Sequence, residues 1–125
     1  MKNRWYQAKV IRGKNQGKNI GFPTINLDNS ALLKRSKKGV YLSHLKINQK
    51  DYYGLLYYGP RLVLNETRNI LEIFILDFSN VVYGKIVKFR LMEFIRGIMN
   101  FSDIQELKKQ IEKDLAYARE MIKYK

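Results

Sequence analysis

A carboxylate interrupts one of the most apolar stretches of the chain. Glu72 lies in the interior of residues 70–78, a segment rich in apolar and β-branched side chains. Burying a carboxylate in such a strand is costly unless it has a partner or a function. A carboxylate can also act as a general base if it comes within about 3 Å of the hydroxyl whose proton it accepts. Glu72 is therefore the first candidate for a catalytic residue, and an ion pair with Arg61 or Arg68 is the structural alternative.

A glycine-rich basic loop near the N-terminus is the second feature whose residues could bind a ligand. Gly13, Gly17 and Gly21 recur at every fourth position, and Lys14 and Lys18 are interleaved with them. Glycine lets a backbone approach a ligand closely and turn its N–H groups inward, and lysine neutralises phosphate charge. The pattern predicts a loop that wraps the phosphates of a nucleotide. A surface turn with solvated lysines is the alternative.

The segment 21–27 continues this loop with two hard oxygen donors. Pro23 fixes its own φ angle and biases Phe22 toward extended geometry. In an extended segment residues i and i+2 share a face, so the Thr24 hydroxyl and the Asn26 carboxamide oxygen point the same way. Such donors beside a phosphate loop suit a magnesium nucleotide. Local turn capping by these side chains is the alternative.

Composition places the chain among globular proteins. Its 125 residues suffice for one domain, and 46% are hydrophobic. There is no cysteine, which excludes a disulfide framework and a thiolate metal site. No apolar run approaches the ~20 residues of a membrane helix, and the first residues lack the apolar core of a secretory signal. A cytoplasmic location without membrane attachment is expected.

Positive charge is concentrated in the first part of the sequence. The net charge is +13, and residues 1–50 hold twelve lysines and arginines against a single acid, Asp28. A one-sided basic field attracts an anion, such as a nucleotide, a nucleic acid or membrane phosphate. Improved solubility is the simpler explanation, and charge alone does not separate the two.

Apolar periodicity predicts short strands followed by one helix. The expected strands cover residues 6–11, 40–47, 51–58, 61–64, 70–78 and 85–94. Asn48 and Gln49 are expected to form a hairpin turn. Ser102 is the expected N-cap of a helix from Asp103 to about Ile122, with a glutamine three residues after Ser102 completing a capping box. Many short strands and one terminal helix describe a small barrel with a helix packed on it.

Several of these motifs together resemble the riboflavin kinase family, over a span from about residue 8 to residue 119. Residues 21–27 resemble its Pro-Thr-Ala-Asn signature, and residues 72–78 resemble its Glu-x-His-hydrophobic-hydrophobic-Asp-Phe strand. Residues 94–96, then Phe101 and the final helix, resemble its C-terminal signature. Each motif alone is weak, but their common order and spacing make the resemblance strong.

The resemblance implies a mainly β fold, a six-stranded antiparallel Greek-key barrel with a C-terminal α-helix. It also implies transfer of the ATP γ-phosphate to the 5′-hydroxyl of riboflavin to give FMN, with Mg²⁺ accompanying ATP. In bacteria this module usually follows an FMN adenylyltransferase domain, which this sequence lacks. We expect residues 1–125 to form a single riboflavin kinase-like domain that is a monomer.

The resemblance also implies roles for particular residues. The nucleotide-binding residues would be Gly13, Lys14, Gly17, Lys18, Gly21, Pro23, Thr24 and Asn26. Thr24 and Asn26 would also bind Mg²⁺, and Glu72 would be the general base. Arg96 and Phe101 would face the flavin.

The sequence departs from the family pattern at Phe74, which replaces the usual histidine, and at two places toward the flavin side. Ile98 stands where many relatives have glutamate. Many bacterial relatives carry Arg-Pro-Thr after a glycine, whereas this chain keeps Arg61 and continues with Leu62 and Val63. These changes leave the nucleotide side intact.

Two other functions are compatible with the sequence. A catalytically weak relative could bind flavin or FMN as a sensor, which would fit the altered flavin side. A nucleic-acid-binding barrel could use the basic first part of the chain, but this function would leave Glu72 and the Thr-x-Asn spacing unexplained and ranks last.

Overall fold

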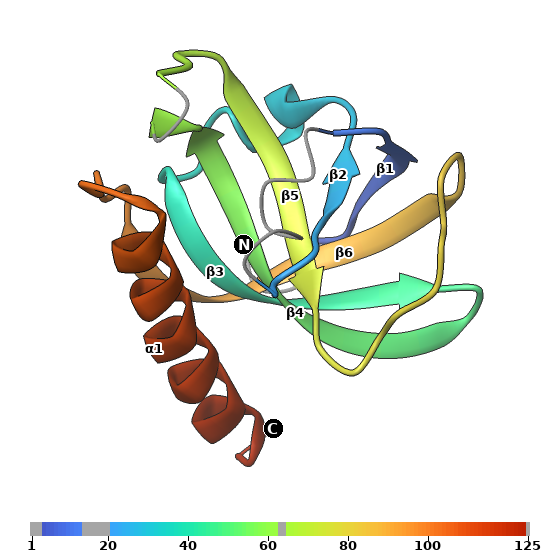
Figure 1. The fold of residues 1–125 in the computed structure, drawn as a ribbon. Helices are drawn as coiled ribbons and strands as arrows, with labels where there is room; N and C mark the ends of the chain where they lie inside the picture. The colour runs from blue at the N-terminus through green and yellow to red at the C-terminus, as the bar shows by residue number, and fades with distance from the viewer. Residues whose placement is uncertain (1–3, 14–20, 63–64, 125) are drawn as a thin grey trace.

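The computed structural model describes residues 4–13, 21–62 and 65–124, and within them six strands close into an antiparallel barrel (Figure 1). The strands are β1 (Tyr6–Ile11), β2 (Ile25–Leu27), β3 (Gly39–Ile47), β4 (Lys50–Pro60), β5 (Asn69–Ile75) and β6 (Ile86–Gly97). Their order around the barrel is β1-β2-β5-β4-β3-β6. A short 3-10 helix, η2 (Ser30–Leu33), and the helix α1 (Ile104–Ile122) complete the described elements. The expected barrel with a C-terminal helix is confirmed.

The strand boundaries differ from expectation at several places. β4 begins earlier and ends later than expected. The expected hairpin turn at Asn48 and Gln49 is confirmed, and their φ angles of 51° and 69° suit such a turn. β5 ends at Ile75, because the chain turns at Leu76 and Asp77. Arg61 and Leu62 follow β4 as a connection and do not begin a strand, while residues 63–64 lie outside the described part.

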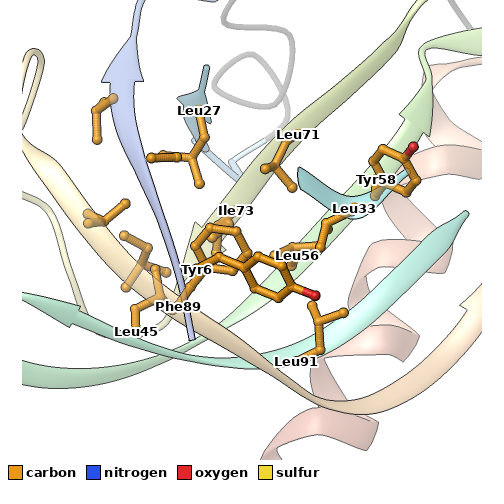
Figure 2. Packing of buried hydrophobic residues seen from close by; sticks show 14 of the residues in the cluster. Tyr6, Leu27, Leu33, Leu45, Leu56, Tyr58, Leu71, Ile73, Phe89 and Leu91 are labelled. Atoms are coloured by element: carbon orange, nitrogen blue, oxygen red, sulfur yellow. The ribbon is translucent and has the colours of Figure 1, made fainter. Parts of the chain in front are cut away.

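Alternation along the strands creates an apolar barrel interior. Figure 2 shows side chains from several strands meeting there. The fully buried members of this cluster include Leu45, Leu56, Ile73, Phe89 and Leu91. Because successive strand residues point to opposite faces, the residues between them lie on the outside of the barrel.

A second apolar cluster lies on that outer face, where α1 covers it. Leu42 of β3, Leu55 of β4 and Met92 of β6 pack with Ala118 of α1, and Figure 1 shows the helix along this side of the barrel. In the described part of the chain, no helix is both long and apolar enough to span a membrane. The helix is amphipathic and serves as a wall over part of the sheet.

The helix begins one residue later than expected. Asp103, not Ser102, is the N-cap: its backbone is extended, and its carboxylate accepts a hydrogen bond from the Glu106 N–H at 2.9 Å. A carboxylate at this position satisfies a free backbone donor and also interacts favourably with the helix dipole. The expected capping box from Ser102 is therefore wrong.

Asp103→Ala should lower the free energy of unfolding by about 1 kcal/mol, because it removes the N-cap acceptor. Ser102→Ala should change it little. Urea unfolding followed by circular dichroism measures both variants. A larger loss in Ser102→Ala than in Asp103→Ala would contradict this assignment.

Candidate active site

One row of side chains crosses the outer face of five strands. Asn26 of β2 is paired in register with Glu72 of β5, and Glu72 is paired with Tyr57 of β4. Tyr57 is paired with Val40 of β3, which is paired with Arg96 of β6. Side chains of paired residues lie on the same face of a sheet. The strand register alone therefore places these five side chains side by side, one from each strand, around the barrel.

Glu72 lies at the centre of a polar cluster at one end of this row. Its Oε2 accepts a hydrogen bond from the Thr24 hydroxyl at 3.1 Å and lies 3.4 Å from Nη2 of Arg61. The same Nη2 donates to Asn26 Oδ1 at 2.7 Å. The structure thus brings Glu72 together with Thr24 and Asn26, which lie far from it in the sequence. It also shows the ion pair with Arg61 that was the structural alternative for Glu72.

Tyr57 closes the cluster on the β4 side. Burial raises the pKa of Tyr57 to about 12, and the negative charge of Glu72 acts in the same direction. The phenol therefore stays protonated at neutral pH, and its hydroxyl donates a hydrogen bond to the carbonyl of Pro60. This bond lies within β4 and holds the Tyr57 side chain at the end of that strand, next to Arg61.

Two glycines of the predicted phosphate loop lie in the described part. A Cβ at Gly13 would lie 2.1 Å from Nδ2 of Asn26, so this position must be glycine for the Asn26 side chain to stay where it is. Gly21 has a φ of +88°, which glycine adopts without strain. Pro23 is exposed just before Thr24. The three other predicted residues of this loop, Lys14, Gly17 and Lys18, lie outside the described residues.

An apolar pocket opens beside the polar cluster, between the outer face of the barrel and α1. Its cavity volume is about 130 Å³, and it is partly open to solvent. Its apolar wall includes Phe22, Leu55, Phe74, Phe101 and Ile111. Glu72, Thr24 and Arg61 also line it, so the Glu72 carboxylate faces an apolar pocket.

Two aromatic rings lie where the apolar pocket meets the polar cluster. The rings of Phe22 and Phe74 lie edge to face with centroids 5.4 Å apart. Such a pair is favourable beyond its apolar burial. Phe74 thus packs against the segment that precedes Thr24.

Arg96 lines the pocket but is already ion-paired. Its Nε donates to both carboxylate oxygens of Asp114 at 3.0 and 2.9 Å. Asp114, only 3% exposed, also accepts from the Gln110 side chain. The Arg96 guanidinium lies 5.8 Å from the centroid of the Phe101 ring. The predicted flavin-side residues are therefore adjacent, and Asp114 fixes the arginine between β6 and α1.

The other departures from the family pattern are also on this side. Ile98 packs against Gly59, where an added Cβ would lie 2.5 Å from Ile98 Cδ1. Leu62 lines the pocket, and Val63 lies outside the described residues. An apolar residue at position 98 therefore fills space over the end of β4.

The donor set of the polar cluster fits a magnesium ion only together with a phosphate ligand. Residues 4–13, 21–62 and 65–124 contain no group of three or more histidine or acidic side chains placed to hold a metal. Thr24 supplies a hydroxyl oxygen, which lies 3.1 Å from Glu72 Oε2. Asn26 supplies an amide oxygen, which lies 2.7 Å from Arg61 Nη2. Mg²⁺ commonly binds through one or two protein groups plus substrate phosphates, so these residues fit Mg²⁺ bound with a nucleotide.

Sequence reasoning missed two members of the site. Tyr57 was read as part of a strand, and the register that sets it opposite Glu72 is not visible in a single sequence. Asp114 belongs to the final helix, and an acid between apolar residues of an amphipathic helix is a signal that could have marked it as buried. Arg61 was named as a possible partner of Glu72, but its bond to Asn26 was not expected.

A family model described as riboflavin kinase matches residues 2–122. A bifunctional riboflavin kinase/FMN adenylyltransferase of Bacillus subtilis is 36% identical over 120 residues, which is 92% of this chain and 36% of that protein. A protein of Mycoplasmoides gallisepticum named trifunctional protein RibF/MnmA is 33% identical over 110 residues, 88% of this chain and 17% of that protein. The chain therefore spans about a third or less of the length of these two relatives.

A similar solved structure is that of a riboflavin kinase from Trypanosoma brucei. It has a TM-score of 0.68 and 22% identity, and the match covers 95% of this chain and 79% of that one. At this level of identity the match supports the barrel fold itself.

Asp114→Ala should lower the free energy of unfolding by about 3 kcal/mol, because it leaves the Arg96 guanidinium without its buried partner. Glu112→Ala, on the exposed side of the same helix, is the matched control and should change stability little. Urea unfolding measures the free energy of unfolding of both variants. Equal stability of the two variants would mean that the Arg96–Asp114 pair does not hold α1 to the barrel.

Proposed function

The chain belongs to the riboflavin kinase family, and we propose that it transfers the γ-phosphate of ATP to the ribityl 5′-hydroxyl of riboflavin, giving FMN. The relatives' names supply only the kinase activity. The role of each group follows from its place in the candidate site.

The observation that carries this proposal is the position of Glu72. Its carboxylate lies where the polar cluster meets the apolar pocket, within 3.1 Å of the Thr24 hydroxyl and 3.4 Å of Arg61. Phosphoryl transfer requires mainly that the reactants be positioned and that charge be stabilised. A base at this junction can reach a hydroxyl carried by a ligand in the pocket, while the phosphates lie beside Thr24 and Asn26.

Thr24 and Asn26 form the phosphate side of the proposed site. Their oxygens would hold Mg²⁺ together with the ATP phosphates, and the ion would supply neutralisation of phosphate charge. Gly13 allows the Asn26 amide to lie directly against the backbone. The segment from Gly13 to Gly21 would contribute further backbone N–H groups, in keeping with its composition.

The apolar pocket forms the flavin side. Phe22, Phe74 and Phe101 offer aromatic surface to a planar ring. Arg96, held by Asp114, offers a fixed positive charge at the opposite wall. A riboflavin ring placed here would direct its ribityl chain toward Glu72.

Glu72 would accept the proton of the 5′-hydroxyl as that oxygen forms its bond to the γ-phosphorus. The bond between the γ-phosphorus and the bridging oxygen of ADP breaks, so that ADP leaves with the electron pair of that bond. The hydrogen bond from Thr24 holds Oε2 in place before the reaction. Positioning of this kind is a large part of catalysis in such sites.

Glu72→Gln should reduce kcat for FMN formation by about 10²–10⁴-fold, because the amide cannot accept the proton. The fold and the KM for ATP should change little, since the amide has the same shape. Chromatographic separation of the flavins after incubation with riboflavin, ATP and Mg²⁺ gives the rates. The exposed carboxylate variant Glu120→Gln is the control, and normal turnover in Glu72→Gln would remove Glu72 from the base role.

Gly13→Ala should raise the KM for ATP roughly ten-fold, corresponding to the loss of about one ligand interaction when Asn26 is pushed aside. Gly97→Ala is a suitable comparison, since a Cβ there meets no atom within 4 Å. Initial rates at varied ATP concentration measure the effect. An unchanged KM in Gly13→Ala would show that Asn26 is not needed at its observed position.

A further inference from the structure

Arg61 occupies the oxygens that the proposed function assigns to the reacting groups. Its Nη2 lies 2.7 Å from Asn26 Oδ1 and 3.4 Å from Glu72 Oε2, and its Nη1 lies 3.9 Å from Glu66 Oε1. The side chain is only 13% exposed. A guanidinium keeps its charge at every accessible pH, so the site already contains a cation between its oxygen donors.

A second cation cannot approach the same oxygens without repulsion at short range. Free Mg²⁺ would be repelled by the positive charge of Arg61. Arg61 would also lose its contacts with Asn26 and Glu72 without forming new ones. The Mg²⁺ complex of ATP carries a net negative charge. Its phosphates can pair with the guanidinium, so that Arg61 exchanges Asn26 and Glu72 for phosphate oxygens. The charge at this position therefore distinguishes the metal nucleotide from the free metal.

We propose, on the basis of the proposed function, that Arg61 is a positioning and selectivity residue. In the ligand-free protein it holds Asn26 and Glu72 in place and keeps free divalent cations out. The metal nucleotide, but not the metal alone, displaces its guanidinium from these oxygens.

The surroundings of Arg61 allow this movement without unfolding. The backbone carbonyl of Arg61 accepts a hydrogen bond from the Glu66 N–H at 3.1 Å, and the carbonyl of Pro60 is bound by the Tyr57 hydroxyl. These bonds fix the main chain on both sides, so the displacement is confined to the side chain. Glu66 lies close enough to remain its partner when Nη2 leaves Glu72.

The deciding experiment titrates Mn²⁺ into the full chain without nucleotide or flavin and measures free Mn²⁺ by electron paramagnetic resonance. Arg61→Met removes the charge and keeps the stem of the side chain. It should bind Mn²⁺ at least roughly ten-fold more tightly than the unmodified protein. The double variant Arg61→Met/Glu72→Gln should lose this gain, and Arg68→Met, an exposed arginine of the same connection, should behave as the unmodified protein.

A folded Arg61→Met protein that binds Mn²⁺ no better than the unmodified protein overturns the proposal, as does a gain that survives in the double variant. Because no substrate is present, this outcome is separate from the kinase assay: absence of FMN formation by the unmodified protein would overturn the proposed function and leave the Mn²⁺ result interpretable.

If Arg61→Met does not fold, nitrogen-15 NMR of the arginine side chains in the unmodified protein gives the answer. The Arg61 signal, assigned by its loss in Arg61→Lys, should shift on saturation with Mg²⁺ and a non-hydrolysable ATP analogue. It should not shift with the same concentration of Mg²⁺ alone. Equal shifts under both conditions, or no shift at saturation with the analogue, would overturn the proposal.

Discussion

The candidate site depends on the register of three neighbouring strands. Pairing of β2 with β5 sets Asn26 opposite Glu72, and pairing of β5 with β4 sets Glu72 opposite Tyr57. A shift of β5 by one residue would turn Glu72 into the barrel interior and expose its apolar neighbours. The buried residues that fix this register, Leu71 and Ile73, are therefore as necessary to the site as the polar groups.

The helix α1 forms the second wall of the pocket. The outer face of the barrel would be an open surface without α1, and the pocket exists because the helix stands over it. The apolar contact at Ala118 and the buried Arg96–Asp114 pair hold the helix in place. One wall is thus set by strand register and the other by a single helix, which leaves the space between them for a ligand.

Much of the fold could be predicted from the sequence because alternation and helical periodicity are local signals. β1 was predicted with its observed bounds, and the terminal helix nearly so. Contacts across strands were not predictable in the same way. Glu72 could be singled out by its unusual position, but the Arg61–Asn26 bond and the placement of Tyr57 depend on register between distant segments. The N-cap was misplaced because two adjacent residues can both cap a helix and only geometry separates them.

The most direct test of the central claim is a crystal structure of the protein with riboflavin, Mg²⁺ and a non-hydrolysable ATP analogue. The claim predicts the flavin ring in the apolar pocket, with the ribityl 5′-hydroxyl within about 3 Å of a Glu72 carboxylate oxygen. It also predicts the terminal phosphate on the side of Thr24 and Asn26. A complex in which the 5′-hydroxyl faces away from Glu72, or in which the phosphates lie elsewhere on the barrel, would contradict it.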